Sequence, residues 1–598
     1  MKKGMTLFLC IVALFTCISG CAKKNEPVED NDTKSEKTSE NTTLTEEVSL
    51  QGTGDYVVYF KNNELFCYDL ETEKSFQLSE QLYSGGNISE HEGYIFEEGD
   101  EAYVLSGFVS IYRPGKTIFY PDHIELNKDE CGVPLYCRSL EEDSKSMLID
   151  TNVYFYTIND DADIVTYIKH YENENHEAYD ELCRYNFTSG KVEEICKDTD
   201  KYFYFVSADG ETLLYLDYDK DKWIIMDENG NTTELKYHTG SRDVYTDKNL
   251  ENIFYVKEDG LLYKSIHGGS ETLVSDLPDK TIVPMDKVQV VSGIDSNGNE
   301  ILPDDYDADA VFVDEVYVFE SGEAYFTLSN NNYSEDKLKE LYYYDGNKSA
   351  LVSDSYRKTK YAGRKNAVLV FGDGKYDDTS FDSYAAVKGN AVLLDITGIY
   401  GNGWDSGCAG DEAGNILYIQ DSNTGDLQEI KYDENGNLTG KVLDKDTRPE
   451  IYVLDNDLIL YFTEENTLIN GDAFSDCEVF EVDKEKKQVV LLTWDDELKL
   501  YDIDNKTEIK LGSCSYAIDR RLFTFTNKGT VAYVDEEEGN NLWLYNNITG
   551  EKTQIDDNVD FLFRNYNQKN FGEVYIDSDF FESSTVNKDE NLYEFLLR

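Results

Sequence analysis

A short module of three predicted strands repeats along this chain, and the repeat constrains the fold more than any other feature. Its first copy has apolar runs at 56–60, 65–70 and 75–78, separated by polar turns at 62–63 and 71–74. Aromatic and β-branched runs between Asn, Asp, Gly and Lys residues favour antiparallel hairpins. The sequence therefore predicts short strands joined by tight turns.

The best-kept part of the module is Leu-x-x-Tyr followed by Asp or Asn and a turn. Such copies begin at Leu65, Leu182, Leu341, Leu498 and Leu542, and looser ones begin at Leu135, Trp223 and Leu261. Adjoining copies are roughly 40 to 47 residues apart, which is typical of β-propeller blades. We therefore expect an all-β chain.

The length of the repeating part predicts more than one ring. About 540 residues follow position 55, and at roughly 43 residues per blade they make twelve or thirteen blades, whereas one ring usually has four to eight. We expect two tandem propellers, at 56–291 and 292–598, because the stretch 292–309 is the most broken. The alternative is one seven- or eight-bladed propeller with insertions such as 159–180 and 376–383.

These repeats resemble the WD40-like and TolB-type propeller repeats, including those of uncharacterised propeller lipoproteins of Gram-positive bacteria. The resemblance covers most of the chain after Asp55. The Gly-His and Trp-Asp pairs of true WD40 blades do not recur, since Trp404-Asp405 and Trp494-Asp495 stand alone. The resemblance implies a ring of blades with an interaction surface, and it implies no particular ligand.

The first residues predict export. A basic start at 1–3 precedes an apolar run at 6–19 that is too short to be a stable membrane span, so we expect a signal peptide at 1–20. Its end, Ile18-Ser19-Gly20-Cys21, resembles a bacterial lipobox. The resemblance implies that Cys21 carries a diacyl lipid and is the first residue of the mature protein.

Residues 21–55 are predicted to be a disordered acidic tether, because almost none of them is apolar after the lipidated cysteine. With the lipid, the tether would hold the folded part at the extracytoplasmic face of the cell membrane. The formal net charge of −65 makes nucleic acid an unsuitable partner.

The chain carries no recognisable catalytic constellation, so we expect no enzyme, no cofactor and no metal. The six histidines are dispersed, and no Gly-x-Ser-x-Gly elbow or phosphate-binding loop is present. Two acidic loops, Asp217–Asp221 and Asp305–Asp309, resemble the start of a calcium loop. Both lack its later glycine and glutamate, so solvated turns are the favoured interpretation.

One loop differs from the hairpin pattern and supplies the candidate binding residues. Glycines crowd the segment 401–410 around Trp404, Asp405 and Ser406. A flat apolar ring beside hydrogen-bonding groups suits a sugar or a protein interface. A bulged crossing between two blades is the structural alternative.

Two cysteines test the hairpin register. Cys183 and Cys196 lie symmetrically about the turn at Ser189-Gly190, and in an ideal hairpin they would face each other. We expect them to be reduced, because a disulfide between directly opposed strand residues is strained.

Three functions follow from these patterns. The first is a membrane-anchored extracytoplasmic lipoprotein that binds a protein or glycan partner or acts as a scaffold. The second is a glycan-active hydrolase that uses carboxylates in a propeller funnel. The third is an accessory sensor or an envelope-assembly factor.

Overall fold

The computed structural model describes the folded part of the chain in segments. They are 56–79 except 63, 110–112, 117–122, 133–140, 144–158, 164–172, 178–199 except 188, 204–236 except 208, 244–288 except 248, 293–294, 300–301, 310–330, 339–361, 367–373, 382–396, 407–411, 415–432, 438–455, 458–463, 466–475, 477–483, 486–514 except 494, 522–526 and 529–563. The chain divides into two compact units, residues 1–48 and 49–598, and every described residue belongs to the second.

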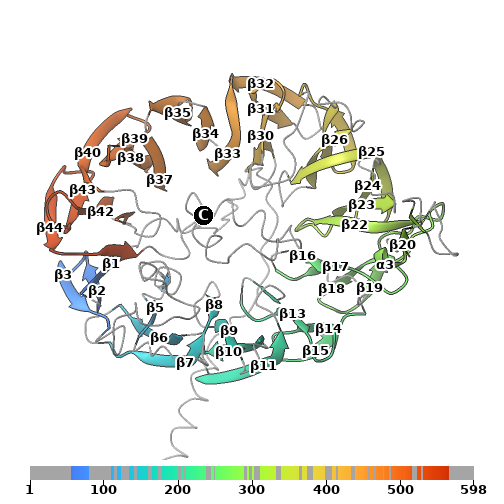
Figure 1. The fold of residues 1–598 in the computed structure, drawn as a ribbon, viewed down its shortest axis with the longest axis horizontal. Helices are drawn as coiled ribbons and strands as arrows, with labels where there is room; N and C mark the ends of the chain where they lie inside the picture. The colour runs from blue at the N-terminus through green and yellow to red at the C-terminus, as the bar shows by residue number, and fades with distance from the viewer. Residues whose placement is uncertain are drawn as a thin grey trace, which may run out of the picture. The chain divides into compact units, whose positions relative to one another are not determined.

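The second unit is an all-β propeller (Figure 1). In its described residues, nine sheets have four strands, and one seven-stranded sheet divides into two blades that share a strand, so the ring has eleven blades. All pairings within these sheets are antiparallel. They join successive strands, except that the last strand pairs with the first in blade 1. Neither two tandem propellers nor a ring of seven or eight blades describes this arrangement.

The first five blades come in chain order. Blade 1 has β1 (Tyr56–Lys61), β2 (Glu64–Asp69), β3 (Lys74–Gln77) and the last strand, β45 (Phe561–Phe563). Blade 2 has β4 (Ser110–Tyr112), β5 (Thr117–Pro121), β6 (Val133–Ser139) and β7 (Met147–Val153). Blade 3 has β8 (Phe155–Ile158), β9 (Ile164–Glu172), β10 (Ala178–Asn186) and β11 (Lys191–Thr199). Blade 4 has β12 (Tyr204–Val206), β13 (Leu213–Asp217), β14 (Lys222–Met226) and β15 (Thr232–Glu234). Blade 5 has β16 (Val244–Thr246), β17 (Asn252–Val256), β18 (Leu262–Ile266) and β19 (Glu271–Leu273).

An insertion then precedes the two joined blades. It contains α3 (Met285–Val288), β20 (Gly293–Ile294) and β21 (Glu300–Ile301). Blade 6 has β22 (Val311–Val318), β23 (Ala324–Asn330), β24 (Lys339–Tyr344) and the first part of β25 (Ser349–Tyr361). Blade 7 has the second part of β25, then β26 (Val368–Asp373), β27 (Asp382–Val387) and β28 (Asn390–Leu393).

The last four blades complete the ring. Blade 8 has β29 (Cys408–Gly410), β30 (Ile416–Gln420), β31 (Leu427–Tyr432) and β32 (Leu438–Asp444). Blade 9 has β33 (Thr447–Asp455), β34 (Leu458–Thr463), β35 (Asn466–Ile469) and β36 (Asp472–Ser475). Blade 10 has β37 (Cys477–Asp483), β38 (Gln488–Thr493), β39 (Glu497–Asp502) and β40 (Thr507–Ser513). Blade 11 has β41 (Phe523–Phe525), β42 (Thr530–Asp535), β43 (Asn541–Asn546) and β44 (Lys552–Asp556).

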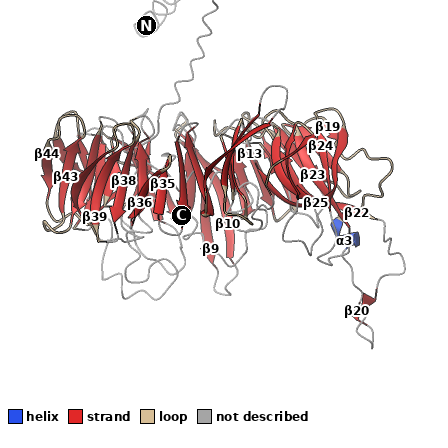
Figure 2. Cartoon of the chain, turned by 90° about the horizontal axis from the view of Figure 1, so that it is seen from above, coloured by secondary structure: helices blue, strands red, loops and turns tan. Residues whose placement is uncertain are grey.

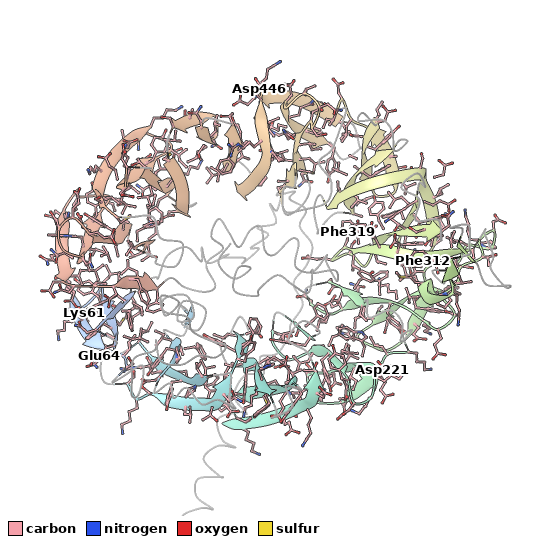
Figure 3. The ribbon with its side chains drawn as sticks, in the orientation of Figure 1. Lys61, Glu64, Asp221, Phe312, Phe319 and Asp446 are labelled. Carbon is pink, nitrogen blue, oxygen red and sulfur yellow. The ribbon has the colours of Figure 1, made fainter. Side chains whose placement is uncertain are left out.

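The ring closes through blade 1, which combines the start and the end of the described chain. β45 pairs with β1, so that Phe60 lies opposite Phe561 and Val58 opposite Phe563. The Lys61 ammonium, labelled in Figure 3, bonds Asp556 at 2.6 Å and Asp557 at 2.9 Å from the preceding blade. Because the last described strand pairs with the first, all eleven blades belong to one ring rather than two.

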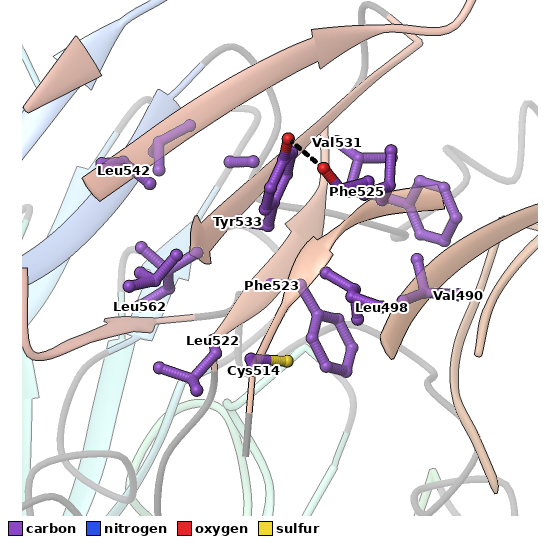
Figure 4. Packing of buried hydrophobic residues seen from close by; sticks show 14 of the residues in the cluster. Val490, Leu498, Cys514, Leu522, Phe523, Phe525, Val531, Tyr533, Leu542 and Leu562 are labelled. Atoms are coloured by element: carbon purple, nitrogen blue, oxygen red, sulfur yellow. Dashed lines mark hydrogen bonds between the residues drawn. The ribbon is translucent and has the colours of Figure 1, made fainter. Parts of the chain in front are cut away.

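The hydrophobic core lies between neighbouring blades. One cluster joins blades 10, 11 and 1 through Val490, Leu498, Tyr533, Leu542 and Leu562 (Figure 4). Side chains alternate between the two faces of a strand, so each blade packs against both neighbours. Tyr342 and Tyr344 accordingly belong to one cluster and Tyr343 to the next.

The ring has two faces, which take their names here from the chain. The terminal face is the one on which β1 begins at Tyr56 and β45 ends at Phe563. Asp69 pairs with Tyr56, so the turn after Asp69 lies on this face too. The opposite, hairpin face carries the end of β1 at Lys61 and, in blade 3, the end of β9 and the start of β10. α3 and β20 extend on the hairpin face too (Figure 2).

One local prediction, made for a ring of seven or eight blades, was wrong. The segment 159–180 is not an insertion, because Ile164–Glu172 forms the second strand of blade 3. In the described part of the chain, no helix is long and apolar enough to cross a membrane.

Candidate functional site

The residues that the sequence singled out for function lie outside the described residues. These are the lipidation candidate Cys21 and the loop residues Trp404, Asp405 and Ser406. The described chain stops at Ile396 and resumes at Gly407, whose backbone oxygen accepts a 2.7 Å hydrogen bond from the Gln420 amide. Both predictions therefore stay predictions.

The repeated Asp or Asn of the module closes a turn. The Asp69 carboxylate accepts hydrogen bonds from the amides of Glu71 at 2.7 Å and Thr72 at 3.3 Å. Asp345 accepts them from Asn347 and Lys348, both at 2.9 Å. A short side chain that binds the backbone two or three residues later stabilises the turn without help from other blades. This part of the acidic composition is structural.

The acidic loop Asp217–Asp221 is also a turn, between β13 and β14. The Lys220 ammonium bonds the Asp217 carboxylate at 2.7 Å, and the Lys220 amide bonds the other oxygen at 3.1 Å. Asp221, labelled in Figure 3, has φ 49°. Within the described ranges no group of three His, Cys, Asp or Glu side chains could hold a metal ion. The second acidic loop, Asp305–Asp309, lies outside the described residues.

The end of the β9–β10 hairpin is the most distinctive surface of the described chain. Both strands have nine residues, whereas the second strands of the other described blades have five to seven. The hairpin consequently extends past its neighbours on the hairpin face (Figure 2).

Two tyrosines stack near this end. Tyr171 and Tyr179 are directly opposite in the register, and their rings are 5.1 Å apart with an interplanar angle of 18°. Tyr179 is 40% exposed. On the same side of the hairpin, Lys169 bonds Asp150 at 2.8 Å, and the Tyr167 hydroxyl donates to the same carboxylate at 2.6 Å.

The other side of the hairpin carries a histidine and a buried carboxylate. His170 Nδ1 and Asp180 Oδ1 are 2.5 Å apart, and the Tyr154 ring lies 5.1 Å from the imidazole. The Asp180 carboxylate therefore orients the His170 ring, and the second ring nitrogen, Nε2, takes no part in this hydrogen bond.

Carboxylates crowd the neighbouring connection between blades 3 and 4. Burial and the charges of Asp219, Asp180 and Asp217 raise the pKa of Asp198. Burial and neighbouring negative charge both favour the protonated form of a carboxyl group. The hairpin end and this connection, together called the hairpin site, combine an aromatic pair, a His–Asp pair and surplus negative charge.

Sequence reasoning missed the hairpin site, and the alternative of a seven- or eight-bladed ring treated 159–180 as an insertion. The run Ile164-Val165-Thr166-Tyr167-Ile168 carried the signal, since four of its five residues are β-branched. The polar residues that follow it concealed how far the strand continues.

The cysteine pair differs from the ideal hairpin. A β-bulge in the outermost strand places Cys196 opposite Leu182 and Cys183 opposite Glu194. The thiols consequently lie in different interfaces, Cys183 toward blade 2 and Cys196 toward blade 4, and both are free and buried. Burial raises the pKa of Cys183 to about 12 and that of Cys196 to about 11.

Comparisons with known proteins bear on the fold alone. No family model matches this sequence, and no curated protein matches it. Solved structures of similar shape include the β-propeller domain of the trilobed protease from Pyrococcus furiosus, with 11% identity, coverage of 60% of this chain and 95% of that chain, and a TM-score of 0.23.

Two further structures are similar to parts of the ring. A eukaryotic initiation factor has 8% identity, coverage of 77% of this chain and 96% of that chain, and a TM-score of 0.36. The extracellular domain of a putative one-component system from B. thetaiotaomicron has 9% identity, coverage of 84% and 70%, and a TM-score of 0.19. At such similarity no function transfers, and the propeller fold follows from the sheet order itself.

Proposed function

We propose that this chain is a lipid-anchored binding or scaffold protein, held at the extracytoplasmic face of a bacterial membrane through Cys21. The lipobox-like Ile18-Ser19-Gly20-Cys21 after a short apolar run supports the anchor. The resemblance of the repeats to propeller lipoproteins of Gram-positive bacteria supports the same location.

The arrangement of the two faces is the observation that carries the binding role. The described chain begins at Tyr56 on the terminal face, and the hairpin site lies on the opposite face. A protein or glycan partner that contacts the hairpin face therefore does not meet the start of the described chain. Propellers are compatible with such a role because their loops are free while their blade faces pack together.

The anchor is tested by Cys21→Ala, with Cys17→Ala as the matched control. We expect Cys21→Ala to leave the membrane fraction or to accumulate as precursor, and Cys17→Ala to fractionate as the wild type does. Immunoblots of membrane and soluble fractions measure this. Mature Cys21→Ala protein that stays with the membranes contradicts the anchor.

A second candidate function is a carboxylate-dependent glycan hydrolase, and one observation favours it. Burial and the nearby carboxylates raise the pKa of Asp198, which is the direction that a general acid requires. Release of reducing ends from cell-wall polysaccharide by wild type, lost in Asp198→Asn, supports this candidate. Equal release by both proteins excludes Asp198 as the acid.

The sensor or envelope-assembly role is distinguished by its partner. A pull-down from native membranes through the full chain, followed by mass spectrometry, should recover a specific envelope protein under that role. Recovery of a cell-wall glycan instead supports the binding role with a glycan partner.

A further inference from the structure

We propose that the end of the β9–β10 hairpin docks a cationic polypeptide segment, with an Arg or Lys side chain stacked on Tyr179 and paired with Glu181. This inference deepens the binding role proposed above and rests on it. It commits to the chemistry of the partner, a protein segment with exposed positive charge.

The aromatic part of this surface is built by the strand register. Tyr171 and Tyr179 oppose each other across the hairpin and stack with their rings 5.1 Å apart. Of the tyrosines that the structure describes, Tyr179 alone is exposed, at 40%. Many of the other described tyrosines are buried between blades, whereas Tyr179 stacks on the half-buried Tyr171 and leaves part of its ring open to a partner.

The charge next to the aromatic pair selects a cation. Glu181 follows Tyr179 by two residues and so lies on the same face of β10. Its cross-strand neighbour is Lys169, but that ammonium is 2.8 Å from the Asp150 carboxylate. Within the described part of the chain, Glu181 has no ion-pair partner of its own, so a cation from outside can pair with it.

The surroundings add negative charge and little positive charge. On the other side of the hairpin and on the next connection lie Asp180, Asp198, Asp217 and Asp219, with His170 and Lys220 as the facing basic groups. Repulsion among these carboxylates is relieved by a cation and increased by an anion. A guanidinium or ammonium over a tyrosine ring gains attraction from the ring quadrupole as well. An acidic partner is therefore disfavoured, and a neutral one gains nothing from this charge.

The test uses the full chain in detergent micelles and a fluorescein-labelled (Arg-Gly)4 peptide. Fluorescence anisotropy measures its Kd against wild type, Tyr179→Ala, Tyr179→Phe and Glu181→Gln. We expect Tyr179→Ala and Glu181→Gln each to weaken binding about threefold to tenfold, and Tyr179→Phe to keep the affinity, because the ring is retained. A (Glu-Gly)4 peptide should not bind.

Matched controls separate the hairpin from the general attraction of an acidic protein. Ile548→Ala removes an apolar side chain that is 82% exposed on the terminal face, and Glu228→Gln removes one exposed carboxylate from a turn of blade 4. Ile548→Ala should leave the Kd unchanged, and Glu228→Gln should change it less than Glu181→Gln does. Equal losses in Glu228→Gln and Glu181→Gln, or unchanged binding in Tyr179→Ala, overturn the proposal.

Two further outcomes are informative. Hairpin-dependent binding of a chitin hexamer, with no peptide binding, also overturns the proposal, because it assigns the surface to a glycan. The anchor is tested separately, since Cys21→Ala should release the protein from membranes and keep the peptide affinity. A wild-type chain that fractionates with membranes but does not bind the (Arg-Gly)4 peptide thus refutes the docking surface and leaves the anchor standing.

Discussion

Buried tyrosine hydroxyls link neighbouring blades at the scale of single residues. Five of the interblade tyrosines lie on the second strand of a blade, and each donates to the outermost strand of the preceding blade or to the residue after it. They are Tyr59 to Asp556 at 2.8 Å, Tyr120 to the Leu78 oxygen at 3.3 Å, Tyr167 to Asp150 at 2.6 Å, Tyr461 to Asp444 at 3.2 Å and Tyr533 to the Leu511 oxygen at 2.7 Å. Each occupies the fourth position of its strand.

Removal of one such hydroxyl should weaken the ring measurably. Tyr167→Phe deletes the bond to Asp150, and we expect a loss of about 1–2 kcal/mol in the free energy of unfolding, because the acceptor is charged. Urea denaturation followed by tyrosine fluorescence measures the loss. Tyr179→Phe is the control, since its ring is exposed, and an equal loss in both variants contradicts the interblade role.

Asp198 gives a pH prediction at the same scale. Burial and the charges of Asp219, Asp180 and Asp217 raise its pKa in the folded chain, so the folded state favours the protonated form. Its stabilising contribution is therefore present below the pKa of an unfolded Asp, about 3.9, and is lost as the pH rises through the folded pKa.

We consequently expect Asp198→Asn to raise the Tm at pH 7 and to have little effect near pH 3. Differential scanning calorimetry across this range measures the change, with Glu228→Gln as the control. A lower Tm for Asp198→Asn at pH 7 would show that the ionised carboxylate is stabilising instead.

Among the elements, the three-residue strand β45 closes the ring by pairing with β1. Phe561 is 4% exposed, stacks on Phe60 with ring centroids 4.9 Å apart and contacts Phe563. The Asp560 amide adds a 3.0 Å hydrogen bond to the Phe60 oxygen. One short strand thereby joins the last blade to the first.

Phe561→Ala should cost about 3–5 kcal/mol, because it removes a buried ring from the closing contact. Thermal unfolding by circular dichroism measures the loss, and protease sensitivity near β1 should rise with it. Ile548→Ala serves as the exposed control. A small effect of Phe561→Ala would mean that the ring holds together without its closing strand.

The sequence predicted elements well where one repeat was intact, and poorly where the repeat was modified. Leu341–Asp345 and Leu498–Asp502 were predicted as strands with a turn, and both lie in third strands that end at an Asx turn. The bulges in outermost strands such as β11 and β40 left no sequence signal. They depend on how a blade twists against its neighbour, which a single strand does not encode.

For the whole molecule, the all-β propeller was predicted and is confirmed, whereas the number of rings and blades was not. Repeat spacing counts blades only where inserted segments are short, and here the stretches between β3 and β4 and between β19 and β22 are long. Closure also depends on a contact between residues 60 and 561, which local patterns cannot reveal. The proposed binding residues Trp404, Asp405 and Ser406 remain predictions.

A single ring makes a clear prediction for limited proteolysis. One cleavage within 292–309 should leave the two fragments associated on gel filtration, because blades 5 and 6 pack through Phe254 and Phe326 and β45 still pairs with β1. Denaturing gels confirm the cleavage, and light scattering gives the mass of the particle. Separation of the fragments without denaturant would favour two independent propellers.

The pairing of β45 with β1 also determines when folding can finish during synthesis. The Tyr59 hydroxyl and the Asp556 carboxylate are 497 residues apart in the chain. At roughly 5–20 residues per second, about 25–100 s pass between the synthesis of the two partners. Throughout that time β1 offers an unpaired edge to other chains. Holding the nascent chain extended until its last blade emerges would therefore protect this protein from aggregation, and export in an unfolded state would do so.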